Sequence, residues 1–350
     1  MNIGDSYLRG GLDRKGWHDT DLVIEGPSAA AAGRVFVKLW EFSRYFSDPT
    51  NFFPRDAESR RRALSEYFFH DKEVFHYVRN RSLLSPGRRE VIRIPFSGQM
   101  KVLGIDQARD ISEAEGGVPV RILYDNPLFN QEVKKGAATY CKFSCVLNFL
   151  MDRTRESARF FSPYLTITSN QEDLLVAAAR RGVKVELITN SFYSHDMGAV
   201  AYFASVAHYI RLLENGVRIY EWQGNKFLEG IEEREDCQIS ERDFPGRTIH
   251  TKGVVLDGEV AILGSNNMNL RSEKYNSEVM AIVEDPVLAG ELNKVFEYDL
   301  DQDPSRMILC GNRLIKRPRR VREIHLEEAR NFVRKNRFLI ELARVFEKFI

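Results

Sequence analysis

Apolar residues between positions 120 and 300 follow two alternating patterns, which together predict a layered α/β fold. Short apolar runs are typical of buried strands, and an apolar residue every three or four positions is typical of an amphipathic helix. The expected elements are strands at 120–123, 159–165, 183–189 and 217–222 and helices at 171–181 and 197–215. Strands that alternate with helices at these lengths favour neighbouring parallel strands.

Two glycines mark the ends of the expected helices. Gly182 and Gly216 each follow a helical pattern and directly precede a strand pattern. Glycine is common just past a helix end because it adopts a left-handed backbone without strain. We therefore expect each helix to end at its glycine and the next strand to begin there.

A β-hairpin is expected around Asp257 and Gly258, which separate apolar runs at 253–256 and 260–263. An Asp-Gly pair between such runs predicts a two-residue turn. With Leu256 opposite the residue that follows this turn, the register places His250 opposite Ser265. Because side chains alternate across a strand, one face at the end of the hairpin would then carry four polar side chains. They are His250, Lys252, Ser265 and Asn267.

These four side chains suit the chemistry of a phosphoester. Lys252 would supply positive charge, and Ser265 and Asn267 would donate hydrogen bonds to nonbridging oxygens. His250 could attack phosphorus or pass a proton to an alkoxide. The reaction needs no metal, and we expect no cofactor. The alternative is an exposed hairpin on which the polar residues are incidental.

Composition narrows the class of protein. A chain of 350 residues with 43% hydrophobic content is long enough for about two domains with a sizeable core. Lys and Arg number 51 against 50 Asp and Glu, a net charge of +1. This balance removes the general argument for a nucleic-acid partner, although a local basic face is still allowed.

The cysteines indicate the kind of cellular compartment, and the apolar runs indicate whether a segment could span a membrane. Four cysteines, Cys141, Cys145, Cys237 and Cys310, form no CxxC pair, so we expect neither a disulfide framework nor a zinc site and infer a reducing compartment. The sequence has no run of 18 apolar residues, and its first residues are polar and rich in glycine. We therefore expect no spanning helix or signal peptide, and any membrane contact would be peripheral.

Three segments are less clearly patterned. Residues 43–118 contain a helix-like stretch at 61–81 and a short strand candidate at 91–95, and residues 223–249 form an acidic segment expected to be a solvated loop. Residues 323–350 predict an amphipathic helix beside a basic cluster at 316–322. That helix could pack on the core or contact anionic lipid.

The hairpin segment resembles a known motif. The spacing His250-x-Lys252-x4-Asp257-x6-Gly264-Ser265-x-Asn267 is similar to the second HKD motif of the phospholipase D superfamily, in its bacterial cardiolipin synthase branch. The resemblance extends over about two thirds of the chain. It includes the segments 162–164, 181–185, 188–191 with Asp196, 215–220, 271–272 and 276–278, and the front segments 2–7, 17–20 and 25–27.

The resemblance implies a fold and a domain division. It implies a phospholipase D-like α/β fold, a mixed sheet flanked by helices, with a partial first lobe and a nearly complete second lobe. Residues 1–118 would be the C-terminal part of a first lobe with an insertion, and residues 119–305 a second lobe that carries the HKD motif. Residues 306–350 would form a basic, helical C-terminal extension.

The first HKD motif of the family is expected to be missing. If Asn2 ends a first motif, its His, Lys and Asp would precede residue 1. The other HxK pattern, at 70–72, lies on an expected helix without the residues that should follow it, so we interpret it as unrelated. We therefore expect transfer activity only if the chain dimerises or a longer upstream sequence supplies the first motif.

The resemblance assigns roles to individual residues. Asp19 and Glu278 correspond to carboxylates that orient the imidazoles, and which histidine each one holds is open. Asp257 is expected to hold the hairpin or pair with Lys252 rather than touch substrate, and His18 to be structural. The expected catalytic set is His250, Lys252, Asp257 and Glu278; the expected phosphate-binding set is Lys252, Ser265, Asn267 and Asn2, with Asp19 in support.

The resemblance also implies a reaction and partners. The expected reaction is phosphatidyl transfer through a phosphohistidine, from phosphatidylglycerol or a similar phospholipid to give cardiolipin, or hydrolysis if water is the acceptor. The expected location is cytoplasmic, peripheral on the inner face of a bacterial membrane, with a homodimer as one possible state. The alternatives are a phosphodiesterase acting on nucleic acid and a noncatalytic remnant of the family.

Overall fold

The computed structural model describes residues 17–24, 28–30, 32–34, 36–37, 97–98, 100–103, 118–124, 142–195, 198–224, 236–238, 248–274, 276, 278–300, 307–316 and 319–345. The predictions for Asn2, for residues 61–81 and 91–95 and for most of the acidic segment lie outside these ranges.

A nine-stranded mixed sheet forms the centre of the described structure. Its strands, in spatial order, are β16 (Val321–Glu323), β8 (Arg218–Trp222), β7 (Lys184–Asn190), β6 (Ser157–Phe161), β11 (Gly253–Leu256), β12 (Val260–Gly264), β13 (Val279–Glu284), β5 (Val118–Tyr124) and β3 (Ser97–Gly98). Strands β6, β7 and β8 are parallel, which confirms the alternating strand and helix pattern. The other pairings in the sheet are antiparallel.

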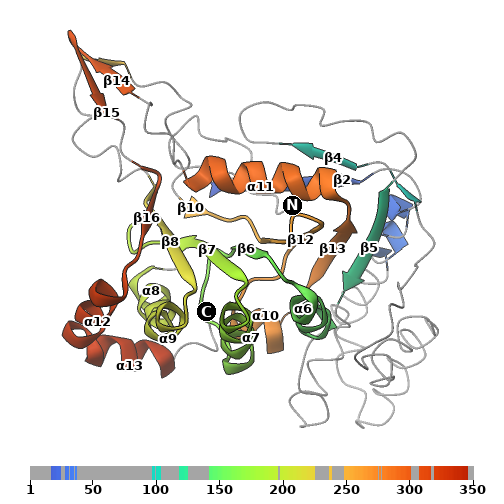
Figure 1. Ribbon diagram of the computed structural model, residues 1–350, viewed down its shortest axis with the longest axis horizontal. Helices are drawn as coiled ribbons and strands as arrows, with labels where there is room; N and C mark the ends of the chain where they lie inside the picture. The colour runs from blue at the N-terminus through green and yellow to red at the C-terminus, as the bar shows by residue number, and fades with distance from the viewer. Residues whose placement is uncertain are drawn as a thin grey trace, which may run out of the picture.

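Helices cover both faces of this sheet, which is the expected α/β class with a mixed sheet (Figure 1). One face carries α6 (Lys142–Arg153), α7 (Ser169–Arg180), α8 (Gly198–Val206) and α9 (Tyr209–Glu214). The long helix α11 (Pro286–Leu300) lies across the other face. A short helix, α10 (Leu270–Lys274), follows the hairpin.

Successive residues of a strand point to opposite faces of the sheet, so they pack into two separate hydrophobic cores. On β7, Leu187 packs into the core beneath α7 and α9, and the next residue, Ile188, packs with Phe296 of α11. Each such side chain contributes about 1.5–3 kcal/mol when fully buried. Strand β7 is buried from residue 185 to residue 190, although the polar residues Glu186 and Thr189 interrupt its apolar positions.

The expected elements match with local differences. Gly182 and Gly216 have positive φ angles of 93° and 86°, which confirms the helix ends. The helix expected at 197–215 is divided into α8 and α9 by a turn at 207–208. Strand β6 ends at Phe161 rather than continuing to residue 165. Proline at position 163 lacks the N–H that a ladder would need.

The C-terminal segment differs from the single expected helix. It forms a hairpin of β14 (Met307–Cys310) and β15 (Arg313–Lys316), then β16, and then two helices, α12 (Leu326–Lys335) and α13 (Arg337–Val345). Strand β16 joins the central sheet beside β8. This segment is therefore partly integrated into the core rather than only appended to it.

A disulfide joins Cys237 to Cys310, contrary to the prediction from cysteine spacing. Strand β9 (Cys237–Gln238) pairs with β14 and places the two cysteines directly opposite each other. They lie 73 positions apart in sequence. Spacing rules detect close pairs such as CxxC, whereas this pair depends on strand pairing between distant segments.

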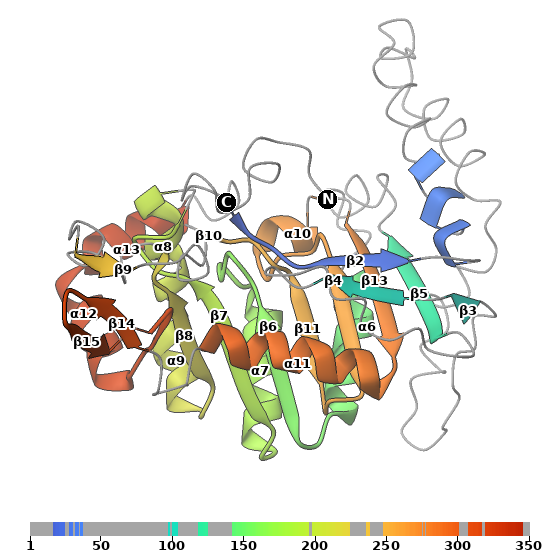
Figure 2. The ribbon, with the colours of Figure 1, turned by 90° about the horizontal axis from the view of Figure 1, so that it is seen from above.

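Two small strand pairs lie over the central sheet. Strand β1 (Trp17–His18) is parallel to β10 (Thr248–Ile249), and β2 (Asp21–Ile24) is antiparallel to β4 (Met100–Leu103). Figure 2 shows β2, β10 and α10 toward one edge of the molecule. The β1 to β10 pair joins the front of the chain to the segment that precedes the HKD hairpin.

Candidate active site

The pairing of β1 with β10 places Asp19 beside His250. Each residue directly follows its strand, and the backbone N–H of His250 donates to the carbonyl oxygen of His18 at 2.7 Å. The Oδ2 atom of Asp19 lies 3.0 Å from Nδ1 of His250. A carboxylate on one ring nitrogen fixes the tautomer and leaves the lone pair on the other. The structure therefore pairs Asp19 with His250, a choice that the sequence left open.

Lys252 lies against the same imidazole. Its Nζ atom is 2.9 Å from each ring nitrogen of His250 and 2.5 Å from the carbonyl oxygen of that residue. Both side chains are buried. An ammonium held here would place a full positive charge next to a nucleophile or an incoming phosphate. Asp19, His250 and Lys252 thus form one contiguous cluster.

Asn190 holds the segment that leads into His250. At the end of β7, its Nδ2 donates to the carbonyl oxygen of Ile249 at 2.9 Å, and its Oδ1 accepts from the N–H of Ile249 at 2.9 Å. Thr248 donates from its hydroxyl to the carbonyl oxygen of Ser194 at 2.7 Å. These bonds imitate a strand pairing and fix the backbone just before the imidazole.

His18 lies in the core beneath this segment. Its Nε2 is 3.0 Å from Oδ2 of Asp299 on α11, and the two side chains are 1% and 0% exposed. The imidazole stacks on the indole ring of Trp222 with centroids 4.6 Å apart. These contacts support the structural role expected for His18. They also hold β1, the strand that directly precedes Asp19.

A second polar cluster surrounds Glu278. Its carboxylate accepts from the hydroxyl of Ser265, from the hydroxyl of Ser272 at 2.6 Å and from Nδ2 of Asn276 at 3.0 Å. The N–H of Val279 donates to the Ser265 hydroxyl oxygen at 3.0 Å. This cluster ties the end of β12 to the start of β13 and brings Ser265 together with Glu278.

The predicted hairpin register is wrong by one residue. Asp257 and Gly258 make the expected turn, with positive φ angles of 52° and 67°. However, Leu256 pairs with Val260, because Glu259 is an extra residue between the turn and the strand. A one-residue shift exchanges the two faces of a strand. The hairpin alone therefore does not place Ser265 and Asn267 on the face of His250 and Lys252.

In the observed register, Lys252 faces Gly264, whose N–H donates to the Lys252 carbonyl oxygen at 3.3 Å. Gly264 has no room for a side chain. A β carbon there would lie 2.1 Å from the carbonyl oxygen of Val279 and 2.6 Å from Sδ of Met280. The glycine before Ser265 is thus required by the close approach of β13.

Asn267 lies in the turn between β12 and α10. Its backbone N–H donates to the hydroxyl of Ser272 at 3.2 Å. Its Oδ1 is buried without a hydrogen-bond partner among the residues that the structure describes. Its amide therefore has unused hydrogen-bonding capacity. A phosphate-binding role for Asn267 stays a prediction, and Asn2 lies outside the described ranges.

Asp257 lies at the far end of the hairpin. Its carboxylate accepts three backbone N–H bonds, from Arg155, Glu156 and Ser157, at 2.8 to 2.9 Å. Five residues of extended chain span roughly 16 Å between Asp257 and Lys252. Asp257 therefore fastens the turn to the segment before β6, and the alternative pairing with Lys252 does not occur.

Sequence reasoning missed Asn190 and Asp299. Asn190 could have been found, because a polar residue at the carboxyl end of a parallel strand commonly faces a site. Asp299 gives no such signal, since it is one carboxylate on a helix, 281 positions from its histidine.

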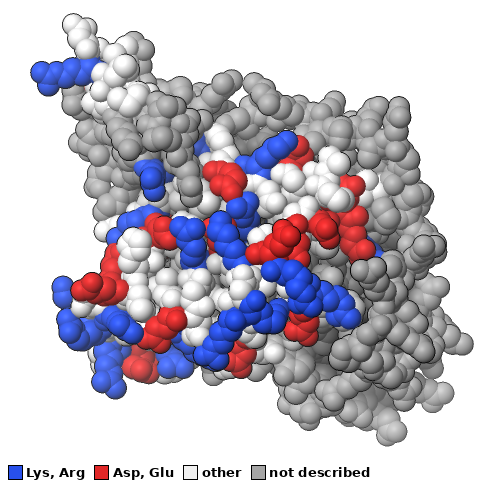
Figure 3. Space-filling model, viewed as in Figure 1, with Lys and Arg blue, Asp and Glu red and all other residues white. Residues whose placement is uncertain are grey.

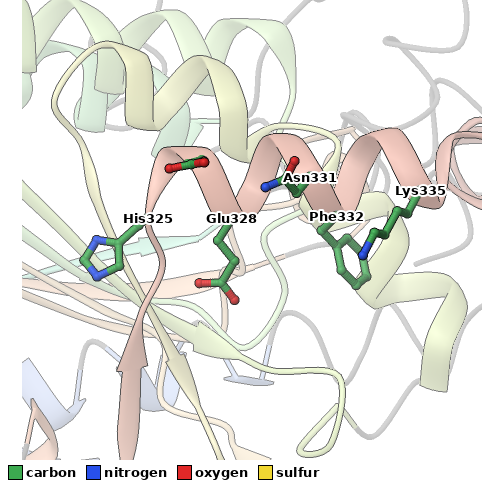
Figure 4. Close-up of a pocket in the computed structure, with 6 residues that line it drawn as sticks. His325, Glu328, Asn331, Phe332 and Lys335 are labelled. Atoms are coloured by element: carbon green, nitrogen blue, oxygen red, sulfur yellow. The ribbon is translucent and has the colours of Figure 1, made fainter.

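A hollow also lies along α12, away from the HKD motif in sequence (Figure 4). It is lined by His325, Glu327, Glu328, Asn331, Phe332 and Lys335. Glu328 is paired with Arg322, and the lining comes from one helix and its cap.

Within the described ranges we find no cluster of three or more His, Cys, Asp or Glu that could hold a metal. The helices described also include none long and apolar enough to cross a membrane.

Residues 147–300 match the family described as "Cardiolipin synthase, PLD-like domain". This segment contains the parallel strands β6, β7 and β8, the hairpin of β11 and β12, and α11. Residues 147–300 are therefore similar to the phospholipase D-like domain of cardiolipin synthases.

Individual relatives show the same similarity. The chain is 30% identical over 148 residues to cardiolipin synthase 1 of Staphylococcus epidermidis, which covers 42% of the chain and 25% of that protein. It is 24% identical over 206 residues to cardiolipin synthase A of Yersinia pseudotuberculosis, and this match covers 59% of the chain and 35% of that protein. The chain spans between 25% and 56% of the length of the curated relatives that it matches, the latter value for an uncharacterized protein of Helicobacter pylori.

A solved structure of the phospholipase D family member Nuc from Salmonella typhimurium is also similar. It covers 59% of this chain and 98% of its own, with 18% identity and a TM-score of 0.38.

Proposed function

We propose that the chain catalyses phosphatidyl transfer between phospholipids, with His250 as the residue that attacks phosphorus. The observation that carries this proposal is the contact of one imidazole with both a carboxylate and an ammonium. Asp19 lies at Nδ1 of His250, and Lys252 lies against the same ring. The family match and the cardiolipin synthase relatives support the choice of a phospholipid as substrate.

The first step would form a bond from Nε2 of His250 to phosphorus and break the bond from phosphorus to the leaving alcohol oxygen. Asp19 would hold the Nδ1 proton and stabilise the positive charge that develops on the ring. Lys252 would stabilise the negative charge on the nonbridging oxygens. The hydroxyl of a second phospholipid would then attack phosphorus and break the bond from phosphorus to Nε2 of His250. The proton of this hydroxyl would pass to the same group that protonated the leaving alcohol.

The leaving alcohol also needs a proton from a second acid. The resemblance assigns this role to a histidine of another HKD motif, and we propose that a second copy of the chain can supply it. Such a shared site predicts that turnover per chain rises with chain concentration in step with dimer formation. Sedimentation velocity and an activity titration at the same concentrations test this point.

The substrate is tested with vesicles of phosphatidylglycerol, with cardiolipin and glycerol measured by mass spectrometry. We expect cardiolipin from the wild-type chain and none from His250→Ala. A phosphatidyl adduct on the His250 peptide, quenched at alkaline pH, identifies the covalent step. Hydrolysis of plasmid DNA without any reaction on phosphatidylglycerol would replace this proposal with a nuclease function.

A further inference from the structure

Helix α13 packs on the domain by one side and exposes apolar residues on the other. Ile340 and Ala343 are buried, and Ala343 packs against Ala201 and Ala204 of α8. On the outer side, Phe338 is 79% exposed and Val345 is 65% exposed. Leu339 and Leu342 are exposed as well. We call the four residues Phe338, Leu339, Leu342 and Val345 the α13 apolar face.

The position of these residues around the helix is unusual for a surface helix. At about 100° per residue, Phe338, Leu342 and Val345 point away from the side on which Ile340 and Ala343 are buried. A surface helix normally places charged or polar side chains there. A contiguous exposed apolar surface of this kind marks an interaction site.

The charges beside the α13 apolar face are mostly positive. Between residues 331 and 345 the exposed basic residues are Arg334, Lys335, Arg337 and Arg344, and the exposed acidic residue is Glu341. At the lower left of Figure 3, where Figure 1 places α12 and α13, basic side chains lie at the surface with some acidic side chains between them. Lys335 and Phe332 project on the same side of α12 in Figure 4. We call the four cations the basic flank.

We propose that the α13 apolar face and its basic flank dock the chain onto an anionic bilayer surface. An amphipathic helix with bulky apolar residues and neighbouring cations lies in the interface plane of such a membrane. A second copy of the chain fits less well, because a twofold contact would bring the same four cations together. The charge of this surface therefore favours an anionic lipid partner.

Figure 2 shows where α13 lies relative to the candidate active site. In Figure 2, α13 and α8 lie toward the same edge of the molecule as β10 and α10. These two elements precede and follow the segment that carries His250 and Lys252. A bilayer along that edge would face both α13 and the two elements that flank the candidate active site. The inference goes beyond the proposed reaction, because binding is measured without turnover.

The test is flotation of the full chain with vesicles of phosphatidylcholine alone or mixed in equal parts with phosphatidylglycerol. We expect binding to the anionic vesicles to be at least about tenfold tighter and to weaken with salt. The combined variant Phe338→Ser, Leu342→Ser and Val345→Ser should lose at least about tenfold in affinity. Arg337→Gln with Arg344→Gln should remove most of the preference for anionic vesicles.

Matched controls come from α11. Val287→Ser removes an apolar side chain that is 57% exposed, and Lys294→Gln removes an exposed cation. Both should bind vesicles like the wild type. Phe338→Ser alone serves if the triple variant does not fold. Equal binding by wild type and Phe338→Ser, or no vesicle binding by the wild type, overturns the proposal.

Two further measurements separate the alternatives. A dimer in the absence of lipid that the triple variant dissociates would identify the α13 apolar face as a contact between copies, and so overturn lipid docking. His250→Ala should bind vesicles like the wild type. If that variant binds and the wild type binds but shows no transfer, the reaction fails while the docking surface stands.

Discussion

The imidazole of His18 and the carboxylate of Asp299 form a buried pair at 3.0 Å that joins the front of the chain to α11. The residue after His18 is Asp19, whose carboxylate bonds to His250. The carbonyl oxygen of His18 also accepts from the N–H of His250. One buried contact therefore supports both bonds that orient the candidate nucleophile.

Replacing Asp299 should affect stability and the reaction together. Asp299→Ala leaves a buried imidazole without its partner, and we expect a loss of about 3–5 kcal/mol in unfolding free energy. Asp299→Asn keeps a hydrogen-bonding group and should restore part of the stability. Urea unfolding measures both values. Glu291→Gln, in a surface pair with Lys294 on the same helix, should change stability by less than about 1 kcal/mol.

Asp299 should also act as a positioning residue. A folded Asp299→Asn chain should show a lower kcat and an altered pH profile of transfer, with little change in KM, because His18 no longer fixes Asp19. A pH profile identical to that of the wild type would restrict Asp299 to a structural role.

Asp19→Asn should leave the fold intact and slow the reaction. An amide in place of the carboxylate cannot stabilise the imidazolium, so we expect kcat to fall about a hundredfold to ten-thousandfold. Initial rates of transfer on phosphatidylglycerol vesicles provide the measurement. Asp173→Asn, at a surface ion pair with Arg211, is the control and should retain full activity. Wild-type rates in Asp19→Asn would remove the carboxylate from the mechanism.

Asp257 should matter for stability and not for chemistry. Asp257→Ala removes three backbone hydrogen bonds and leaves a residue with a positive φ angle. We expect a loss of about 1–3 kcal/mol, with Asp257→Asn losing less because asparagine tolerates this backbone conformation. Thermal melts and turnover per folded chain test the two claims. A stable Asp257→Asn chain with hundredfold lower turnover would restore a catalytic role.

Gly264→Ala should destabilise the hairpin. Its β carbon would meet the carbonyl oxygen of Val279 and Cα of Met280, both backbone atoms that cannot rotate away. Overpacking of this kind costs about 1–3 kcal/mol or more. Gly290→Ala is the matched control, because a β carbon there meets nothing within 4 Å. On helix α11 that change should stabilise the chain by up to about 1 kcal/mol, as denaturant unfolding would show.

Glu221 should make stability depend on pH. Burial raises the pKa of its carboxyl above the ordinary value of 4.5, against the opposing effects of Arg322 and Tyr202. The folded chain therefore holds this proton more tightly than the unfolded chain, and stability falls as pH rises from about 4.5 through the folded pKa. Unfolding curves of Glu221→Gln should lack this decrease. Glu214→Gln, at a surface pair with Arg330, should keep the wild-type pH dependence.

Local patterns in the sequence were sufficient for much of the fold. The apolar runs of β7 and β8, the glycines at 182 and 216 and the Asp-Gly turn at 257 each encode their conformation within a few residues. Backbone preferences and alternating burial act over the same short range, so these predictions needed no tertiary contacts. The spacing of the HKD motif likewise identified His250 and Lys252 as neighbours on one segment.

Tertiary structure decided which distant groups meet. The extra residue at Glu259 shifted the hairpin register, and a strand pairing brought Cys237 to Cys310. The choice of Asp19 as the partner of His250, and of Asp299 as the partner of His18, depends on how β1 packs between β10 and α11. Contacts over such separations are set by the packing of whole elements, which a local pattern does not contain.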